Sequence, residues 1–445
     1  MNTTEKLVEY IQEKSRPLLP ESVKKQAKIC LLDYLGVTCA GACETQKSLI
    51  SYLSHSNSKG FVRLIGMDIS ADVLTSAFVN GFNAHVMELD DGHRYGMIHL
   101  AAPIISAVLA VAQSKRSTGE EILKGIVIGY EAAVRLAVSI QPMHKKRGFH
   151  TAGTCGTIGA AVGAAVILKL NAYQLKTTIS AAATSAAGLL EIQEEASELK
   201  PYNTGHAAMS GVNAAYIGLS GFRSPNDILG GERGMTKVLA DNADLDKMTE
   251  LCEGYEIERI YLKPYAACRH CHSAIEAAIS LKNSTRILPD EIRSMEVNTY
   301  KLAVKGHDHV YIQGIASAKL SIPYSVAAAY ILNTCGPNAF SKENVERKEI
   351  LELAKKVHIN EIPEFSALSP KKRIAEVKLT SYKGHTYTCR IDYAKGDPEN
   401  PMSWEEVERK YYDLMQISNR TENADKILEI INHIETMACD LYKAL

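Results

Sequence analysis

The sequence of 445 residues carries almost no net charge, because 50 lysines and arginines face 51 aspartates and glutamates. A chain without an excess of positive charge has no overall field to attract nucleic acid or an acidic membrane surface. We therefore expect neither nucleic acid nor a membrane among its partners. Any anionic ligand has to be held by local charges.

Long hydrophobic runs are also missing. The longest, AAPIISAVLAVA (101–112) and IGAAVGAAVIL (158–168), are about a dozen residues long, whereas roughly 20 are needed to cross a bilayer. The first residues, MNTTEKLVEYIQEKSRPLLPESV, have neither the basic start nor the apolar stretch of a signal peptide. These absences predict a cytoplasmic protein. The sequence also shows no internal repeat and no glycine-rich phosphate loop.

The stretch CRHCH (268–272) spells C-x-x-C-H, the pattern by which c-type haem is attached. Covalent haem attachment belongs mainly to exported proteins, and thiols in a reducing compartment are usually free. A zinc site would need a second pair of ligands nearby, yet the other cysteines are scattered without ligand spacing. We therefore expect no cofactor and no metal.

Helical periodicity dominates the chain up to about residue 260. Apolar residues recur at i, i+3, i+4 and i+7 in seven segments: 21–42, 70–89, 103–115, 119–138, 157–170, 172–190 and 206–221. Several of these are rich in Ala, Gly and Ser, whose small side chains let helix axes approach closely. Helices that are apolar on nearly every face are usually interior ones. The pattern predicts the buried centre of a large helical domain.

The pattern changes near residue 256. Residues 256–265 and 292–304 contain β-branched and aromatic side chains, and 373–393 alternates apolar and polar residues around a Lys383-Gly384 turn, which is typical of a hairpin. Helical stretches lie between them, at residues 271–283, 322–333 and 342–356.

After the loop AKGDPENP the helices return. Ser403 with Glu406 forms a capping box ahead of an apolar helical pattern. We therefore predict a mainly α protein in which residues 1–262 and 400–445 form a large all-helical domain. Residues 263–399 are predicted to form a smaller, inserted α+β lid domain.

Ionisable residues interrupt the apolar helical patterns at four places. The first, HVMELDDGHRYGMIHLAAP (85–103), holds His85, Glu88, Asp90, Asp91, His93, Arg94 and His99. So dense an acidic and imidazole cluster between two hydrophobic helices is uncommon in a purely structural loop. A solvated loop is one alternative. A metal site made from Asp90, Asp91, His93 and His99 is another, although the spacing matches no recognised ligand pattern.

The second place is RGFHTAGTCGTIGAA, where His150 begins a long apolar helix. Backbone N–H groups at a helix start, beside a cationic histidine, can receive a carboxylate. A histidine there can equally be a simple cap. The other two places share a Lys-Pro-Tyr element ahead of small-residue helices. Their ionisable residues are Lys200 and His206 in LKPYNTGHAAMSG, and Lys263, Arg269, His270 and His272 in LKPYAACRHCHSAIEAA.

These four stretches, together with ICLLDYLGVTCAGA (29–42) and SAKLSIPYSVAAAY (317–330), resemble the MmgE/PrpD family in content and order. That family includes 2-methylcitrate dehydratase, cis-aconitate decarboxylase and iminodisuccinate epimerase. The resemblance implies a helical domain with an inserted α+β lid, a cofactor-independent homodimer, and an active site in the cleft between the domains. The haem spelling then falls on the family's Lys-Pro-Tyr, Cys-Arg, His motif and is a coincidence.

The resemblance also implies which residues line the site. Those of the decarboxylase branch carry over to His99, His150, Lys200, Lys263 and Tyr324, and the leading acidic residue falls on Glu88. Three positions depart from the family pattern, since Glu88 replaces an Asp, Leu100 replaces a Pro, and Cys268 replaces a histidine of the decarboxylase cleft. The last change points away from decarboxylation. The wording ELDDGHRYG is closer to epimerase-like members than to methylcitrate dehydratases.

The reactions of this family place extra negative charge on a substrate that is already a polyanion, so cations aimed at that charge are needed. We expect Lys200, Lys263 and Arg269 to hold carboxylates, with His272 beside them.

The same resemblance suggests how the proton moves. His150 or His99 would act as base, and the other, or Tyr324, would act as acid. Glu88 and Asp91 would orient the imidazoles. We thus predict a lyase of the 2-methylcitrate dehydratase type acting on a small polycarboxylate. An epimerase, a decarboxylase and a non-catalytic carboxylate-binding protein are the alternatives.

Overall fold

Two compact units make up the protein in the computed structural model, which describes residues 1–194, 197–250 and 254–445. The first, here called the helical unit, comprises residues 1–192, 199–260 and 403–445. The second, the α+β unit, comprises residues 193–198 and 261–402. Helices predominate and the described strands form only two small sheets, so the predicted mainly α fold is confirmed.

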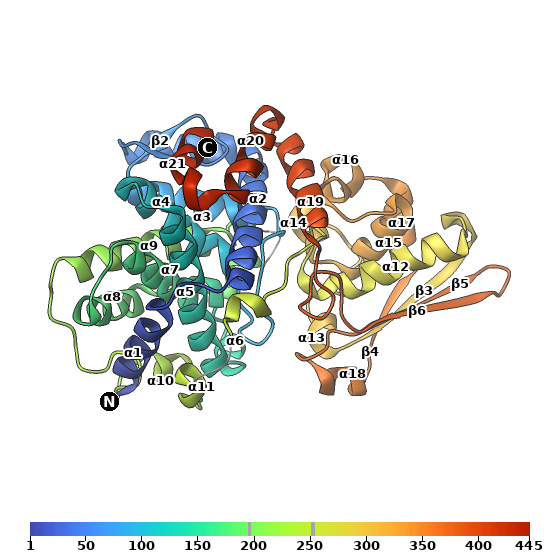
Figure 1. The fold of residues 1–445 in the computed structure, drawn as a ribbon. Helices are drawn as coiled ribbons and strands as arrows, with labels where there is room; N and C mark the ends of the chain where they lie inside the picture. The colour runs from blue at the N-terminus through green and yellow to red at the C-terminus, as the bar shows by residue number, and fades with distance from the viewer. Residues whose placement is uncertain (195–196, 251–253) are drawn as a thin grey trace. The chain divides into compact units, whose positions relative to one another are not determined.

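The helical unit contains most of the long helices and one two-stranded antiparallel sheet, as Figure 1 shows. Its elements are α1 (Thr3–Ser15), α2 (Glu21–Ser56), β1 (Val62–Arg63), β2 (Ser70–Ala71), α3 (Val73–Val86), α4 (Ala101–Lys115), α5 (Gly119–Ile140), α6 (Met143–Lys146), α7 (Thr151–Ile167), α8 (Ala172–Ser185), α9 (Tyr202–Leu219), α10 (Met235–Leu239), α11 (Asp246–Thr249), α19 (Trp404–Ile417), α20 (Thr421–Asn432) and α21 (Ile434–Ala444). None of the described helices is long and apolar enough to cross a membrane.

Helix α7 lies at the centre of this unit, packed against α4, α5, α8 and α9. Every residue of α7 except Val166 is buried. Glycines allow the close approach: a Cβ added at Gly159 would lie 2.7 Å from the Gly129 carbonyl oxygen of α5 and 2.7 Å from the Ala133 Cβ. The small residues in the sequence therefore mark the buried centre of the helical unit, as predicted.

The α+β unit is built on a four-stranded sheet with the order β4-β3-β5-β6. The strands are β3 (Ile292–Thr299), β4 (Val357–Glu361), β5 (Ala375–Ser381) and β6 (Thr386–Ile391). Only the β3 and β4 pair is parallel, and β5 and β6 form the hairpin predicted around Lys383-Gly384. The helices are α12 (His272–Thr285), α13 (Lys301–Val304), α14 (Ile315–Leu320), α15 (Ile322–Leu332), α16 (Lys342–Val345), α17 (Lys348–Ala354) and α18 (Pro363–Leu368).

Local sequence signals set several of these boundaries, although three segments differ from expectation. The Ser403 and Glu406 capping box forms as predicted, with the Ser403 N–H donating to Glu406 Oε2 at 2.7 Å. The helix expected over 342–356 is divided into α16 and α17. Strand β4, which follows α17, was not predicted from the sequence. Only the first of its five residues is buried, so buried and exposed residues do not alternate along the strand. Residues Glu256–Arg259 form a 3-10 turn rather than a strand.

We expect Gly159→Ala to lower the free energy of unfolding by roughly 1–3 kcal/mol, the usual cost of overpacking a close-packed core. The added methyl group would meet the Gly129 carbonyl and the Ala133 side chain, neither of which can move without shifting α5. Denaturant unfolding followed by circular dichroism measures the change. Gly336→Ala is the control, because its new Cβ would meet nothing nearer than the Thr334 Oγ1 at 3.9 Å. Equal stability of the two variants would contradict the packing argument.

Candidate functional site

Asp91 organises the loop that joins α3 to α4. Its Oδ1 accepts hydrogen bonds from the Leu100 N–H at 3.1 Å and the Ala101 N–H at 2.8 Å, which are donors that the first turn of α4 leaves unsatisfied. Its Oδ2 accepts a hydrogen bond from the Tyr130 hydroxyl of α5 at 2.7 Å. Asp91 therefore fixes the start of α4 and ties the loop to α5.

Burial raises the pKa of Asp91 to about 7, even though its three hydrogen bonds oppose the shift. The carboxylate sits 1% exposed, where water cannot solvate its charge. The neighbouring charge of Asp90 raises the pKa further. Ionisation of Asp91 therefore costs stability in the folded protein, and its side chain is partly protonated at neutral pH.

His99 is oriented by the same loop. Its Nδ1 lies 2.7 Å from the Asp91 backbone oxygen, which can only accept, so Nδ1 carries the proton and Nε2 is the basic nitrogen. The same Nδ1 lies 3.4 Å from Asp90 Oδ2. The His99 side chain keeps 17% of its surface exposed, which leaves it within reach of a ligand.

His150 stands at the N-cap position of α7 and is buried. Its Nδ1 lies 3.0 Å from the Asn203 amide nitrogen, which also donates to the Leu189 carbonyl at 3.4 Å. Nδ1 is therefore an acceptor, and a neutral His150 carries its proton on Nε2. Burial lowers the pKa of His150 well below its ordinary value, and the positive charges of His85, Lys200 and His99 act in the same direction.

His85, the penultimate residue of α3, lies close to both of these rings. Its ring centroid is 4.9 Å from that of His99 and 5.8 Å from that of His150. Its Nδ1 lies 2.7 Å from Asp90 Oδ2. The helical unit therefore gathers three imidazoles: His85 and His99, whose Nδ1 atoms face acceptors so that Nε2 is the basic nitrogen, and His150, whose Nε2 is protonated. Such a set can take a proton from one atom of a ligand and donate a hydrogen bond to another.

Glu88 and Lys200 form an ion pair in the same unit. Lys200 precedes α9, and Glu88 sits in the left-handed backbone region with φ of 54°. Both side chains are largely buried, at 11% and 15% exposed. The charge of Glu88 also raises the pKa of His150 against the larger effect of burial, and the expectation that Glu88 orients an imidazole stays a prediction. The pair leaves this part of the cluster without net charge.

Two of the four residues considered for a metal site, Asp91 and His93, have hydrogen bonds to the backbone of their own loop. Asp91 serves α4, and His93 Nδ1 accepts a hydrogen bond from the Gly96 N–H at 3.1 Å. The ligand-type atoms of His85, Asp90 and His99 do lie within 4.8 Å of one another. In that set, however, the two Nδ1 atoms face the Asp90 carboxylate, as imidazoles do when they donate to an acid.

In the α+β unit, Arg269 and His272 are engaged with their own surroundings. Arg269 forms an ion pair with Asp397 at 2.8 Å and donates to the Lys395 carbonyl at 3.1 Å. It also donates to His272 Nδ1 at 2.9 Å, while His272 Nε2 lies 3.1 Å from the Ala267 oxygen. These contacts hold the loop around Asp397. Both residues thus have partners within the unit, and the expectation that they bind a substrate carboxylate stays a prediction.

Tyr324 and Lys263 are buried in the α+β unit. The Tyr324 hydroxyl donates a hydrogen bond to the Ala339 carbonyl at 2.7 Å. Burial raises the pKa of Tyr324, so the hydroxyl keeps its proton. Lys263 is completely buried, and its positive charge contributes to lowering the pKa of His272. Cys271 is also completely buried while Cys268 is partly exposed, an arrangement that does not suit two thioether bonds to one haem.

The imidazole cluster consists of His85, His99 and His150 with their partners Asp90, Asp91 and Asn203. Of these, His85 and Asn203 were not predicted to act in catalysis or binding, and Asp90 was considered only as a metal ligand. Each lies inside a motif that was singled out. Asn203 follows Lys200 by three residues, and its role depends on which ring its amide faces. Only the packing of α9 against α7 supplies that information.

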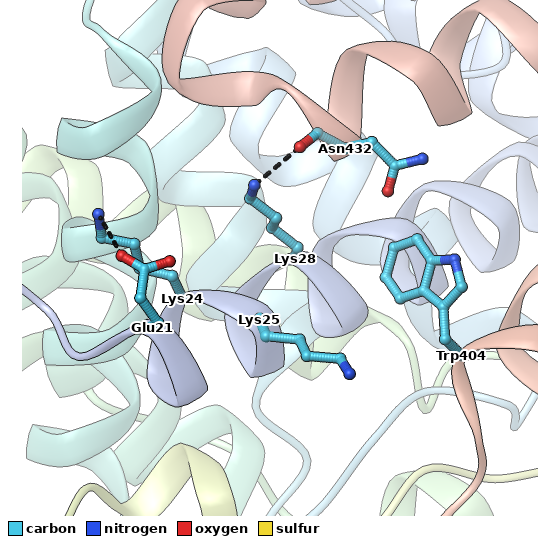
Figure 2. A pocket seen from close by; sticks show the side chains of 6 residues that line it. All are labelled: Glu21, Lys24, Lys25, Lys28, Trp404 and Asn432. Atoms are coloured by element: carbon cyan, nitrogen blue, oxygen red, sulfur yellow. Dashed lines mark hydrogen bonds and ion pairs between the residues drawn. The ribbon is translucent and has the colours of Figure 1, made fainter.

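A pocket of about 220 Å³ elsewhere in the helical unit is also rich in cations (Figure 2). It is lined by Glu21, Lys24, Lys25, Lys28, Trp404 and Asn432. Lys24 pairs with Glu120 at 2.7 Å and Lys28 with Glu435 at 2.8 Å, so most of its positive charge is already neutralised. It contains none of the predicted site residues and offers no acid or base near neutral pH.

Comparisons with known proteins agree with the resemblance. The model of the MmgE/PrpD N-terminal domain matches residues 5–248, and that of the MmgE/PrpD C-terminal domain matches residues 265–436. Cis-aconitate decarboxylase of Homo sapiens is 23% identical, with 94% of this chain and 89% of that protein aligned. Cis-aconitate decarboxylase of Aspergillus terreus is 24% identical over 96% of this chain and 94% of its own length. The Mus musculus protein of the same name is 23% identical over 94% and 88%.

Asp91→Asn should become more stable relative to the unmodified protein as the pH rises from about 4 to about 7. The folded pKa of about 7 exceeds the unfolded value near 3.9, so the native protein loses stability across this range and the uncharged variant does not. The difference should reach a few kcal/mol at most, since one pKa unit is about 1.4 kcal/mol. Thermal unfolding at several pH values measures it. A difference that is independent of pH would contradict the assignment.

Proposed function

Because the chain belongs to the MmgE/PrpD family, we propose that it is a lyase that removes water from a small di- or tricarboxylate. The proposed reaction begins with loss of a proton from a carbon next to a carboxylate. The homodimer and the cytoplasmic location expected from the sequence stay predictions.

The observation that carries this proposal is the opposite tautomers of His99 and His150, whose rings both lie close to His85. Removing water requires both a base for the carbon-bound proton and a donor for the departing oxygen. His99 has a basic Nε2. The lowered pKa of His150 keeps its ring neutral, and the single proton of that neutral ring is on Nε2. A neutral imidazole can polarise an oxygen without carrying a full charge.

In the proposed sequence His99 Nε2 takes the proton and becomes an imidazolium. The Asp90 carboxylate and the Asp91 carbonyl, both beside its Nδ1, stabilise that charge. The electrons of the C–H bond form the new double bond as the C–O bond breaks. His150 donates a hydrogen bond to the departing oxygen, and the proton held by His99 completes the water molecule. Atoms and charge balance without a cofactor.

Cations are needed to hold the carboxylates, and Lys200 is the proposed first one. In the structure it contacts Glu88, so a substrate carboxylate has to share or replace that partner. Lys263, which occurs in the same Lys-Pro-Tyr setting, is proposed as the second. Each fixed cation aimed at the developing charge is worth on the order of 3 kcal/mol where water is scarce. Arg269, His272 and Tyr324 are not used, because their polar groups are engaged within the α+β unit.

Decarboxylation is the second candidate, favoured by the similarity to cis-aconitate decarboxylases. Loss of CO₂ needs a proton donor for the carbanion but no base, so the basic Nε2 of His99 would be idle. In addition, Cys268 stands where the family resemblance implies a histidine of the decarboxylase cleft. Both points favour removal of water.

We expect His99→Ala and His150→Ala each to lower kcat by 100-fold or more, the scale on which a single acid or base group acts. The fold should persist, since the His150 side chain makes no cap hydrogen bond to α7 and His99 precedes the start of α4. His206→Ala is the matched control, because the His206 ring stacks on Tyr202 in α9 and has no role in the proposed reaction. Steady-state kinetics give the result. Turnover within a few-fold of normal in either site variant would remove that histidine from the mechanism.

The reaction type is tested with citrate, 2-methylcitrate, cis-aconitate and iminodisuccinate, each followed by NMR in D₂O after treatment of the protein with EDTA. We expect water loss from a hydroxyl-bearing substrate, at a rate that EDTA does not change. Loss of CO₂ instead would establish the second candidate, and deuterium exchange without net change would indicate an epimerase. Tight binding without turnover would replace the enzyme by a carboxylate-binding protein. Restoration of activity by added metal would overturn metal independence.

A further inference from the structure

Cys268, His270 and His307 form a second cluster of metal-binding side chains, which lies wholly in the α+β unit. One ligand-type atom from each lies within 4.8 Å of the others. Cys268 and His270 belong to the 3-10 turn that precedes α12, and His307 lies in the loop between α13 and α14. All three side chains are partly exposed. The cluster therefore joins two segments far apart in the sequence at a place that solvent can reach.

We propose that this cluster is a Zn²⁺ site. The Cys268 Sγ lies 3.8 Å from His307 Nε2. In a tetrahedral zinc centre with Zn–S near 2.3 Å and Zn–N near 2.0 to 2.1 Å, the same two atoms are about 3.6 Å apart. The observed pair needs only a small inward movement to chelate an ion.

The surroundings orient both imidazoles as the outer contacts of metal sites do. His307 Nδ1 lies 2.8 Å from the Leu320 carbonyl oxygen, so the proton is on Nδ1 and the lone pair of Nε2 faces Cys268. His270 Nδ1 lies 2.6 Å from the Tyr300 hydroxyl, which fixes that ring. The Cys268 N–H donates to the Lys319 carbonyl at 2.8 Å and anchors the thiol-bearing residue.

The donor set selects the metal. A thiolate with two imidazoles suits Zn²⁺ and is a poor site for Mg²⁺ or Ca²⁺, which prefer oxygen. It also differs from the His85, Asp90 and His99 set, where both Nδ1 atoms already face the carboxylate. Three protein ligands leave a fourth position for water, as in open zinc sites. Zinc at this position would cross-link residues 268–270 to the loop of His307 and stabilise the α+β unit by mass action.

Cobalt(II) is the direct probe, because it occupies zinc sites and its thiolate bond gives a charge-transfer band in the near ultraviolet. The full-length, EDTA-treated protein should bind one Co²⁺ per chain with that band, and Zn²⁺ should displace it. Cys268→Ser should abolish the band. Tyr300→Phe should weaken binding by about 10- to 100-fold, the usual cost of losing an outer partner. Cys389→Ser, another partly exposed thiol of the α+β unit, should change nothing.

Absence of the band, or its persistence in Cys268→Ser, would overturn the proposal and leave a thiol-imidazole hydrogen bond as the explanation of the cluster. Added Zn²⁺ should also raise the Tm of the unmodified protein but not that of Cys268→Ser. Equal shifts in both would place the metal elsewhere. These spectroscopic and thermal results do not depend on any catalytic activity, so they stand apart from the test of the proposed lyase reaction.

Discussion

The buried carboxylate of Asp91 is the constraint on which the imidazole cluster depends. Its side chain satisfies the first backbone donors of α4 and the hydroxyl of Tyr130, while its own carbonyl sets the tautomer of His99. One residue thus couples the start of a buried helix to the protonation state of a candidate base. The destabilisation that comes with the raised pKa is offset by the packing of α4, α5 and α7, whose interfaces are almost entirely apolar.

Most of the fold could be predicted from the sequence, because helical periodicity and runs of small residues can be recognised without knowledge of tertiary contacts. The helices α2 to α5 and α7 to α9 overlap the seven apolar segments, although α2 continues to Ser56, past the segment 21–42, and the short α6 was not predicted. The hairpin follows its turn at Lys383-Gly384. Strand β4 could not be predicted, since it is an edge strand whose residues after Val357 are mostly exposed. Its pairing with β3 comes from tertiary contact alone, and so does the break between α16 and α17.

The candidate site could be predicted as a set of motifs but not as a set of contacts. His99 and His150 were singled out because ionisable residues interrupt apolar patterns, yet their different tautomers depend on Asp91 and Asn203, which face them from other elements. For Arg269 and Tyr324 the sequence shows a residue type suited to carboxylates or proton transfer, but it does not show that Arg269 pairs with Asp397 or that the Tyr324 hydroxyl donates to a carbonyl. Composition identifies which groups could do chemistry, whereas geometry decides which of them are available for it.

If Lys200 holds a substrate carboxylate as proposed, its ion pair with Glu88 has a consequence for selectivity. A lysine that already holds an internal carboxylate gains nothing from exchanging it for a simple monoanion, so chloride and acetate are weak competitors. A ligand with two or three carboxylates can displace Glu88 with one of them and still offer further contacts from the same molecule. Glu88 therefore favours the binding of polyanions over that of monoanions. It also compensates the positive charge of Lys200 while no ligand is bound.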